Sequence, residues 1–122
     1  MARGALIGES LKVGASLEPV EMVVTKIVRS ESGDETAGQP RLWTFIEFEL
    51  PDDRAPEWAD ALRGALRVEH GWYCDFRTET ETFVVFAGRI FRYPRGDLDR
   101  RAEAAAHARA VGVPENQLDW PE

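Results

Sequence analysis

Strict alternation of side-chain character marks residues 42–50, whose sequence is LWTFIEFEL. One parity carries leucine, threonine, isoleucine and phenylalanine, and the other carries Trp43, Phe45, Glu47 and Glu49. Successive side chains of a β-strand point to opposite faces of the sheet. The segment therefore predicts a strand with one apolar face, which other elements cover, and one mixed face of aromatics and carboxylates.

Four further segments predict strands. Residues 20–29 are rich in β-branched side chains on both parities, so we expect neither side of this strand to be fully solvated. Residues 82–86 (TFVVF) are also apolar on both parities, which is typical of a central strand. The segments 72–78 and 89–93 complete the set. Residues 1–16 are punctuated by glycine, and a short strand and a turn both stay open for them.

Two segments predict helices. Between Pro51 and Gly71, apolar side chains recur with helical spacing and form one stripe: Trp58, Ala61, Leu62, Ala65 and Leu66. A second helix is predicted over 98–111, with Asp97 as its N-cap and Gly112 at its end. Its stripe consists mostly of alanine, which lets a helix lie close to a sheet.

The predicted element order is ββαβββα. Runs of strands joined by short links, with helices inserted singly, are typical of the α+β class. We therefore expect an antiparallel or mixed sheet of about five strands, with two helices on one face.

The chain length of 122 residues predicts a single domain over residues 1–122. Residues 30–41 contain no large apolar side chain and combine two glycines with a proline, so we expect a flexible loop. The C-terminal residues 113–122 carry Leu118 and Trp120. A tryptophan near a terminus indicates an ordered tail that is held against the body of the domain.

The charge balance argues against polyanionic partners. Twenty-two acidic and 15 basic residues give a formal net charge of −7, and the arginines form no basic run. Such a surface repels phosphate backbones and anionic lipid, so we expect neither nucleic-acid nor membrane binding. No stretch approaches the roughly 20 apolar residues of a membrane span. We expect a cytoplasmic protein, without a disulfide because Cys74 is the only cysteine.

The mixed face of the sheet is the candidate site. If the apolar parity faces the helices, the opposite face collects Trp43, Phe45, Glu47, Glu49, Tyr73, Asp75 and Arg77. Aromatics mixed with charged groups are typical of binding surfaces and interfaces. The alternative is structural: acidic and basic residues form ordinary cross-strand pairs, and the N-terminal segment, the long loop, the tail or a second copy of the chain covers the aromatics.

A catalytic use of the same face also stays open. Glu47 and Glu49 are two apart on one strand face, with Cα atoms roughly 6.5–7 Å apart, a separation that acid/base carboxylate pairs use. A neighbouring Asp75 would raise the pKa of one of them. We expect a binding or interaction module whose partner is a small molecule, a protein or a second copy of the chain. The alternative is a small enzyme with carboxylate acid/base chemistry.

The remaining chemistry-bearing residues predict neither a metal nor a cofactor. Cys74 shares the parity of Trp72 and Phe76, so we expect it to point into the core as an inert thiol. His70 and His107 lack the further ligands of a metal site. The Arg-Gly-Asp triplet at 95–97 is explained by a turn and a helix N-cap.

Four phrases of the chain carry a resemblance: WTFIEFE (43–49), GWYCDF (71–76), ETFVVFAGRIFRYPRGD (81–97) and GVPENQLDW (112–120). In these phrases the chain resembles a group of short uncharacterised bacterial proteins, over most of residues 42–120. The resemblance implies a bacterial protein. It implies no activity, cofactor or site residue.

Overall fold

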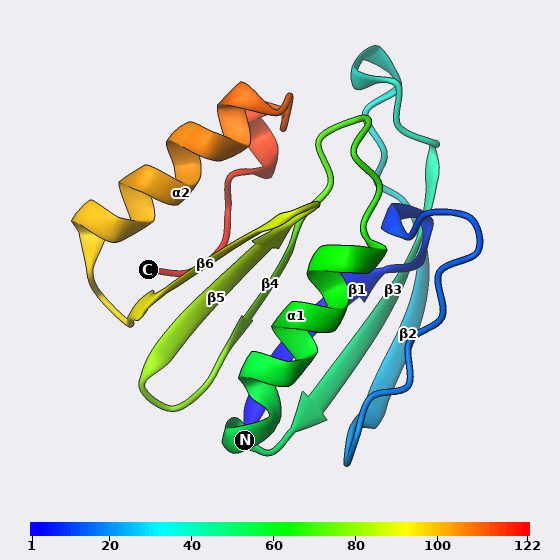
Figure 1. The fold of residues 1–122 in the computed structure, drawn as a ribbon. Coiled ribbons are helices and arrows are strands. Elements are labelled where there is room, and N and C mark those ends of the chain that lie inside the picture. The colour runs from blue at the N-terminus through cyan, green and yellow to red at the C-terminus, as the bar shows by residue number, and fades with distance from the viewer.

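A strand from the extreme N-terminus, β1 (Ala2–Ile7), runs through the middle of the sheet in the computed structural model, which describes residues 1–122 (Figure 1). The sheet has six strands, all antiparallel, in the order β2 (Val23–Glu31), β3 (Leu42–Leu50), β1, β4 (Cys74–Arg77), β5 (Glu81–Phe86) and β6 (Arg89–Pro94). Helix α1 (Ala55–Ala65) follows β3, and helix α2 (Leu98–Ala110) follows β6. The predicted α+β class is confirmed, with six strands rather than about five.

The additional strand is β1, for which the sequence left strand and turn open. It pairs with β3 from Ala2↔Leu50 to Ile7↔Phe45 and with β4 at Arg3↔Arg77 and Gly4↔Phe76. Two small residues and a glycine among its six residues weaken its alternation. The position of β1 in the sheet is therefore evident only from its pairing with β3 and β4.

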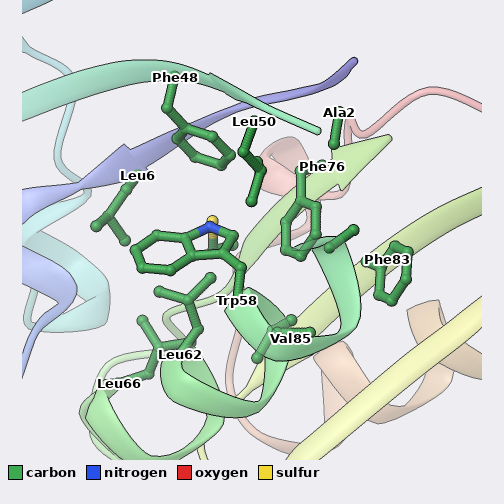
Figure 2. Close-up of a cluster of buried hydrophobic side chains, with 13 residues drawn as sticks. Ala2, Leu6, Phe48, Leu50, Trp58, Leu62, Leu66, Phe76, Phe83 and Val85 are labelled. Carbon is green, nitrogen blue, oxygen red and sulfur yellow. The ribbon is translucent and has the colours of Figure 1, made fainter. Parts of the chain in front are cut away.

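Helix α1 covers one face of the sheet. Its stripe inserts Trp58 and Leu62 among the apolar side chains of β1, β3, β4 and β5, in a cluster of 13 buried residues (Figure 2). The ring centroids of Phe48 and Trp58 are 5.7 Å apart, and Phe76 stacks on Phe83 at 5.0 Å. Full burial of each such side chain stabilises the fold by about 1.5–3 kcal/mol. This cluster is the main core.

Helix α2 lies on the opposite face, so the prediction of both helices on one face was wrong. Val84 and Val85 are neighbours on β5 and therefore point to opposite faces. Val85 belongs to the α1 cluster, whereas Val84 packs with Ala104 and Ala108 of α2. A strand that is apolar on both parities needs cover on both faces, and the helices supply one face each.

The C-terminal tail returns between α2 and the sheet (Figure 1). The buried indole N–H of Trp120 donates a hydrogen bond to Tyr93 Oη at 2.9 Å. Arg101 of α2 donates from Nη2 to the Trp120 carbonyl at 2.8 Å, and its guanidinium lies 4.9 Å from the indole centroid. These contacts hold the tail in place.

Strand β2 forms one edge of the sheet and is solvated on both faces. Val23, Val24 and Ile27 are all at least half exposed. The expectation that neither side of this strand would be fully solvated was therefore wrong for the side that carries Ile27 and Arg29, whereas Val28 and Ser30 on the other side are half-buried. The cause is its position, because α1 lies over the centre of the sheet and α2 over the β5–β6 end.

The ends of α1 also differ from the sequence prediction. The helix stops at Ala65, before Gly71, and the chain passes through left-handed conformations at His70 and Gly71 before β4. No side chain caps the N-terminus of the helix, and the nearby Asp52 is engaged elsewhere. Its carboxylate accepts a hydrogen bond from the Glu79 N–H at 3.2 Å and lies 3.2 Å from the N-terminal ammonium group.

Gly4 provides a test of how closely β1 is packed. A Cβ at this position would lie 2.6 Å from the Asp75 carbonyl oxygen and 2.6 Å from Phe76 Cβ. We expect Gly4→Ala to lower the free energy of unfolding in urea by about 1–3 kcal/mol, because this space is filled.

The matched control is Gly64→Ala on α1, where nothing lies within 4 Å. It should raise stability by about 0.5–1 kcal/mol through helix propensity. Equal effects of the two substitutions would contradict the central placement of β1.

Candidate functional site

A cavity of about 370 Å³ lies on the face of the sheet opposite α1, between β3 and the C-terminal tail. Helix α2 and Trp120 cover the β5–β6 part of this face, and the cavity begins where that cover ends. It is lined by Ala5, Ile7, Ser32, Trp43, Phe45, Gly71, Trp72, Tyr73, Asp75, Asn116, Gln117 and Asp119.

Strand β1 forms the floor of the cavity. Ala2 and Leu6 belong to the α1 cluster, so Ala5 and Ile7, on the other parity, point into the cavity. Ala5 pairs with Glu47 of β3, and the register of β1 with β4 continues to place Asp75 on its other side. Because the Ala5 side chain between Glu47 and Asp75 is only a methyl group, it leaves open space above the strand.

Aromatic side chains form one wall. The ring centroid of Trp43 lies 5.8 Å from that of Phe45 and 5.2 Å from that of Trp72. The parity of Trp72 predicted that it would join the α1 core, and this was wrong, because its ring lines the cavity. The reason is local: Trp72 precedes β4 and follows the left-handed Gly71, so strand alternation does not apply to it.

The opposite wall is the tail, which Tyr73 holds. The Tyr73 hydroxyl donates a hydrogen bond to the main-chain carbonyl of Gln117, and Asp119 Oδ1 lies 3.2 Å from the same hydroxyl oxygen. Burial raises the pKa of Tyr73, and the charges of Asp75 and Asp119 raise it further. The phenol therefore stays protonated and acts as a donor.

A pair of amides joins the tail to the loop of residues 30–41. Gln117 Nε2 donates to Gln39 Oε1 at 2.9 Å, and Gln39 Nε2 lies 3.1 Å from Gln117 Oε1. Gln39 is buried and also donates to the His70 carbonyl at 2.9 Å. This contact, which we call the amide clasp, connects three segments far apart in the sequence at the side of the cavity. The flexibility expected of residues 30–41 stays a prediction.

Asp75 is the chemically distinctive group of the cavity. Its side chain is half-buried, forms no ion pair and accepts no hydrogen bond from another residue's side chain or main chain. Desolvation by burial raises the pKa of Asp75 to about 6, and the nearby charge of Asp119 contributes to the rise. The positive charge of Arg77 acts in the opposite direction. Arg77 is not within ion-pair distance, so this carboxylate has no direct cationic partner.

The structure divides the sequence-predicted site residues into two groups. Trp43, Phe45, Tyr73 and Asp75 line the cavity. Glu47, Glu49 and Arg77 share the same face but lie outside it. Glu49 is paired with Arg3 at 2.9 Å, so the two glutamates do not form an isolated carboxylate pair.

Sequence reasoning did not find the floor and the tail wall. Ala5 and Ile7 give no signal of their own, because small and apolar residues are common everywhere. Gln117 and Asp119 reach Tyr73 and Asp75 only through the returning tail. The one available signal was Trp120, whose burial fixes the tail beside β6.

Other chemistry-bearing groups lie away from this cavity. Cys74 is buried on the α1 face, where its thiol donates to the Ala5 carbonyl at 3.5 Å, and burial raises its pKa. His107 packs edge-on against Phe86 at 4.7 Å. No group of three or more His, Cys, Asp or Glu side chains could hold a metal ion. No helix is long and apolar enough to cross a membrane.

Comparison with known proteins finds no matching family model, no matching curated protein and no matching solved structure. The resemblance to the bacterial group stays a prediction.

The raised pKa of Asp75 predicts how stability depends on pH. The folded chain binds a proton at Asp75 more tightly than the unfolded chain does, between the ordinary pKa of 3.8 and about 6. The contribution of Asp75 to the free energy of unfolding therefore falls as pH rises through this range, and the loss persists above it. We expect Asp75→Asn to be more stable than the wild type at pH 7.5, by about 2–3 kcal/mol, and nearly equal to it at pH 4.

Urea unfolding of both proteins at the two pH values checks this expectation. Asp53→Asn is the matched control, because it removes the same charge from an exposed position outside the cavity. Its difference from the wild type should change little between pH 4 and pH 7.5. A pH-independent difference for Asp75→Asn would contradict the environment described for this carboxyl.

Proposed function

We propose that this protein is a non-enzymatic binding module and that its binding site is the cavity between β3 and the C-terminal tail. The observation that carries the proposal is Asp75, a half-buried carboxylate that faces an aromatic-walled cavity without an ion-pair partner. Burying an unpaired charge costs stability. A ligand that supplies the missing positive charge would explain why the site contains an unpaired carboxylate.

The dimensions of the cavity support this use. Its volume of about 370 Å³ falls within the range of about 300–1,000 Å³ that small-ligand sites occupy, and half of its lining residues are hydrophobic. A smaller cavity of about 100 Å³ lies beside α1, where its one arginine, Arg54, is already paired with Glu21 and Glu57. That cavity offers a ligand less space and no unpaired buried charge.

A small enzyme is the second candidate function, and the pKa of Asp75 favours it. A carboxyl with a pKa of about 6 is suited to proton transfer near neutral pH. The neighbouring groups support binding more than catalysis. The Tyr73 hydroxyl is occupied by the Gln117 carbonyl, and the Cys74 thiol faces the opposite side of the sheet. Turnover of a bound compound that Asp75→Asn abolishes without weakening binding would favour the enzyme.

Self-association is a further proposal, and it involves a different surface. The outer edge of β2 has no strand beside it, and it carries the exposed side chains of Val23, Val24 and Ile27. Unpaired strand edges of this kind can pair with another chain. A second copy of the chain would meet this edge rather than the cavity.

Blocking the floor of the cavity tests the binding function. Ala5→Leu directs a larger side chain into the cavity, and we expect it to abolish fragment binding while changing the free energy of unfolding by less than about 1 kcal/mol. Ala106→Leu, at an exposed position of α2, is the matched control and should bind like the wild type. The measurement is an NMR titration that follows the indole N–H signals of Trp43 and Trp72. The probe is a fragment library of cationic, neutral and anionic compounds.

Two results would overturn the proposed function. One is a wild-type protein in which no fragment shifts these indole signals. The other is an Ala5→Leu protein, shown to be folded by its NMR spectrum, that binds the same fragments with unchanged affinity.

A further inference from the structure

The charges that line the cavity are all negative. Asp75 and Asp119 are its charged residues, and no lysine, arginine or histidine belongs to the lining. The indole nitrogens of Trp43 and Trp72 are buried out of reach of solvent. The Tyr73 hydroxyl already donates its proton to the tail. A ligand that enters this cavity therefore meets carboxylate acceptors and aromatic side chains.

Asp75 has no ion-pair partner, whereas two other carboxylates of the sheet are held by arginines. Glu49 is held by Arg3 at 2.9 Å, and Glu81 by Arg92 at 2.7 Å. Arg77 is the cation whose charge acts on Asp75, but it lies outside ion-pair distance and outside the cavity. Among the charged residues that line the cavity, Asp75 is the one on the sheet itself, and it has no ion-pair partner.

The aromatic wall favours the same kind of ligand. Trp43 lies between Phe45 and Trp72, at centroid distances of 5.8 Å and 5.2 Å. The faces of aromatic rings carry partial negative charge, and they attract cations most strongly where water is displaced. Carboxylates and aromatic side chains around one space together select a positive charge attached to an apolar body.

From this arrangement we infer that the cavity binds an organic cation, whose ammonium or guanidinium group pairs with Asp75 while its apolar part lies against Trp43 and Phe45. The inference rests on the proposed binding function and names its ligand class. Asp119, which is exposed on the tail, adds negative charge at the same end of the cavity. The volume of about 370 Å³ corresponds to roughly a dozen liquid water molecules, which leaves room for a ring or a short alkyl chain beside the charged group.

Three compounds of one shape and different charge test this inference: benzylamine, benzyl alcohol and benzoate. At pH 7.5 we expect benzylamine to bind the wild type at least about tenfold more tightly than benzyl alcohol, because the charge-assisted hydrogen bond and the cation–π contact require the ammonium group. Benzoate should bind most weakly. Dissociation constants come from the indole signals of Trp43 and Trp72.

Single substitutions test which residue causes the preference for benzylamine over benzyl alcohol. Asp75→Asn should reduce the preference of benzylamine over benzyl alcohol to less than about threefold. Asp53→Asn, the exposed control, should keep it. Asp119→Asn should weaken benzylamine binding by a smaller factor than Asp75→Asn, because its side chain is exposed and its charge is screened by solvent.

The pH dependence provides an independent readout. Lowering the pH from 7.5 to 5 protonates Asp75, so the affinity for benzylamine should fall and that for benzyl alcohol should not change. The fall should be absent in Asp75→Asn. Other charged and titratable groups face this carboxyl from the tail, β3, β4 and β6. They are Asp119, Glu47, Tyr73, Arg77 and Tyr93.

The cation can come from a free small molecule or from the side chain of a partner protein. Cadaverine, a free diamine, and a blocked Ala-Lys-Ala peptide present the same ammonium group from these two sources. Tighter binding of cadaverine identifies a small-molecule ligand, and tighter binding of the peptide identifies a lysine side chain of a partner.

The outcomes separate this inference from the proposed function. If benzyl alcohol or benzoate binds as tightly as benzylamine, or if only anionic and neutral fragments from the library bind, the cation inference is wrong and the binding function stands. If nothing binds in the cavity, both are wrong. An unchanged preference in folded Asp75→Asn would also overturn the assignment of the charge contact.

Discussion

The pairing of β1 with both β3 and β4 holds the two halves of the sheet together. Strands β2 and β3 form one antiparallel unit and β4, β5 and β6 form another, and β1 joins them through backbone hydrogen bonds on both of its edges. Its alternation places Leu6 under α1 and Ala5 in the cavity, so the same strand contributes to the core and to the candidate site. Gly4 permits the close approach of β4 that this position requires.

The cavity follows from how the second face of the sheet is covered. Helix α2 contacts the sheet through alanines, and a helix of small residues lies close to the strands but covers only part of a six-stranded surface. The tail extends this cover as far as Asp119. The amide clasp between Gln39 and Gln117 then ties the tail to the loop before β3. The site is therefore a boundary between covered and open sheet, built from segments at both ends of the chain.

Electrostatics give this boundary its chemical character. Arginine balances two other carboxylates of the sheet, in the ion pairs of Glu49 with Arg3 and of Glu81 with Arg92. Asp75 is half-buried and has no ion-pair partner, and the partial loss of solvation that raises its pKa also lowers the stability of the folded protein at neutral pH. Local instability of this kind is often retained where it serves binding.

Features that depend on local periodicity were predictable from the amino-acid sequence. These are the bounds of β3, the helix after Asp97, the two buried faces of β5 and the orientation of Cys74. Alternation records which side chains share a face, and capping residues record where a helix begins. Neither records which element will cover a face. The sequence therefore did not predict the position of β1, the opposite placement of the two helices or the proximity of Asp75 and Asp119. Each depends on contacts between segments distant along the chain, and those contacts form only when the whole sheet assembles.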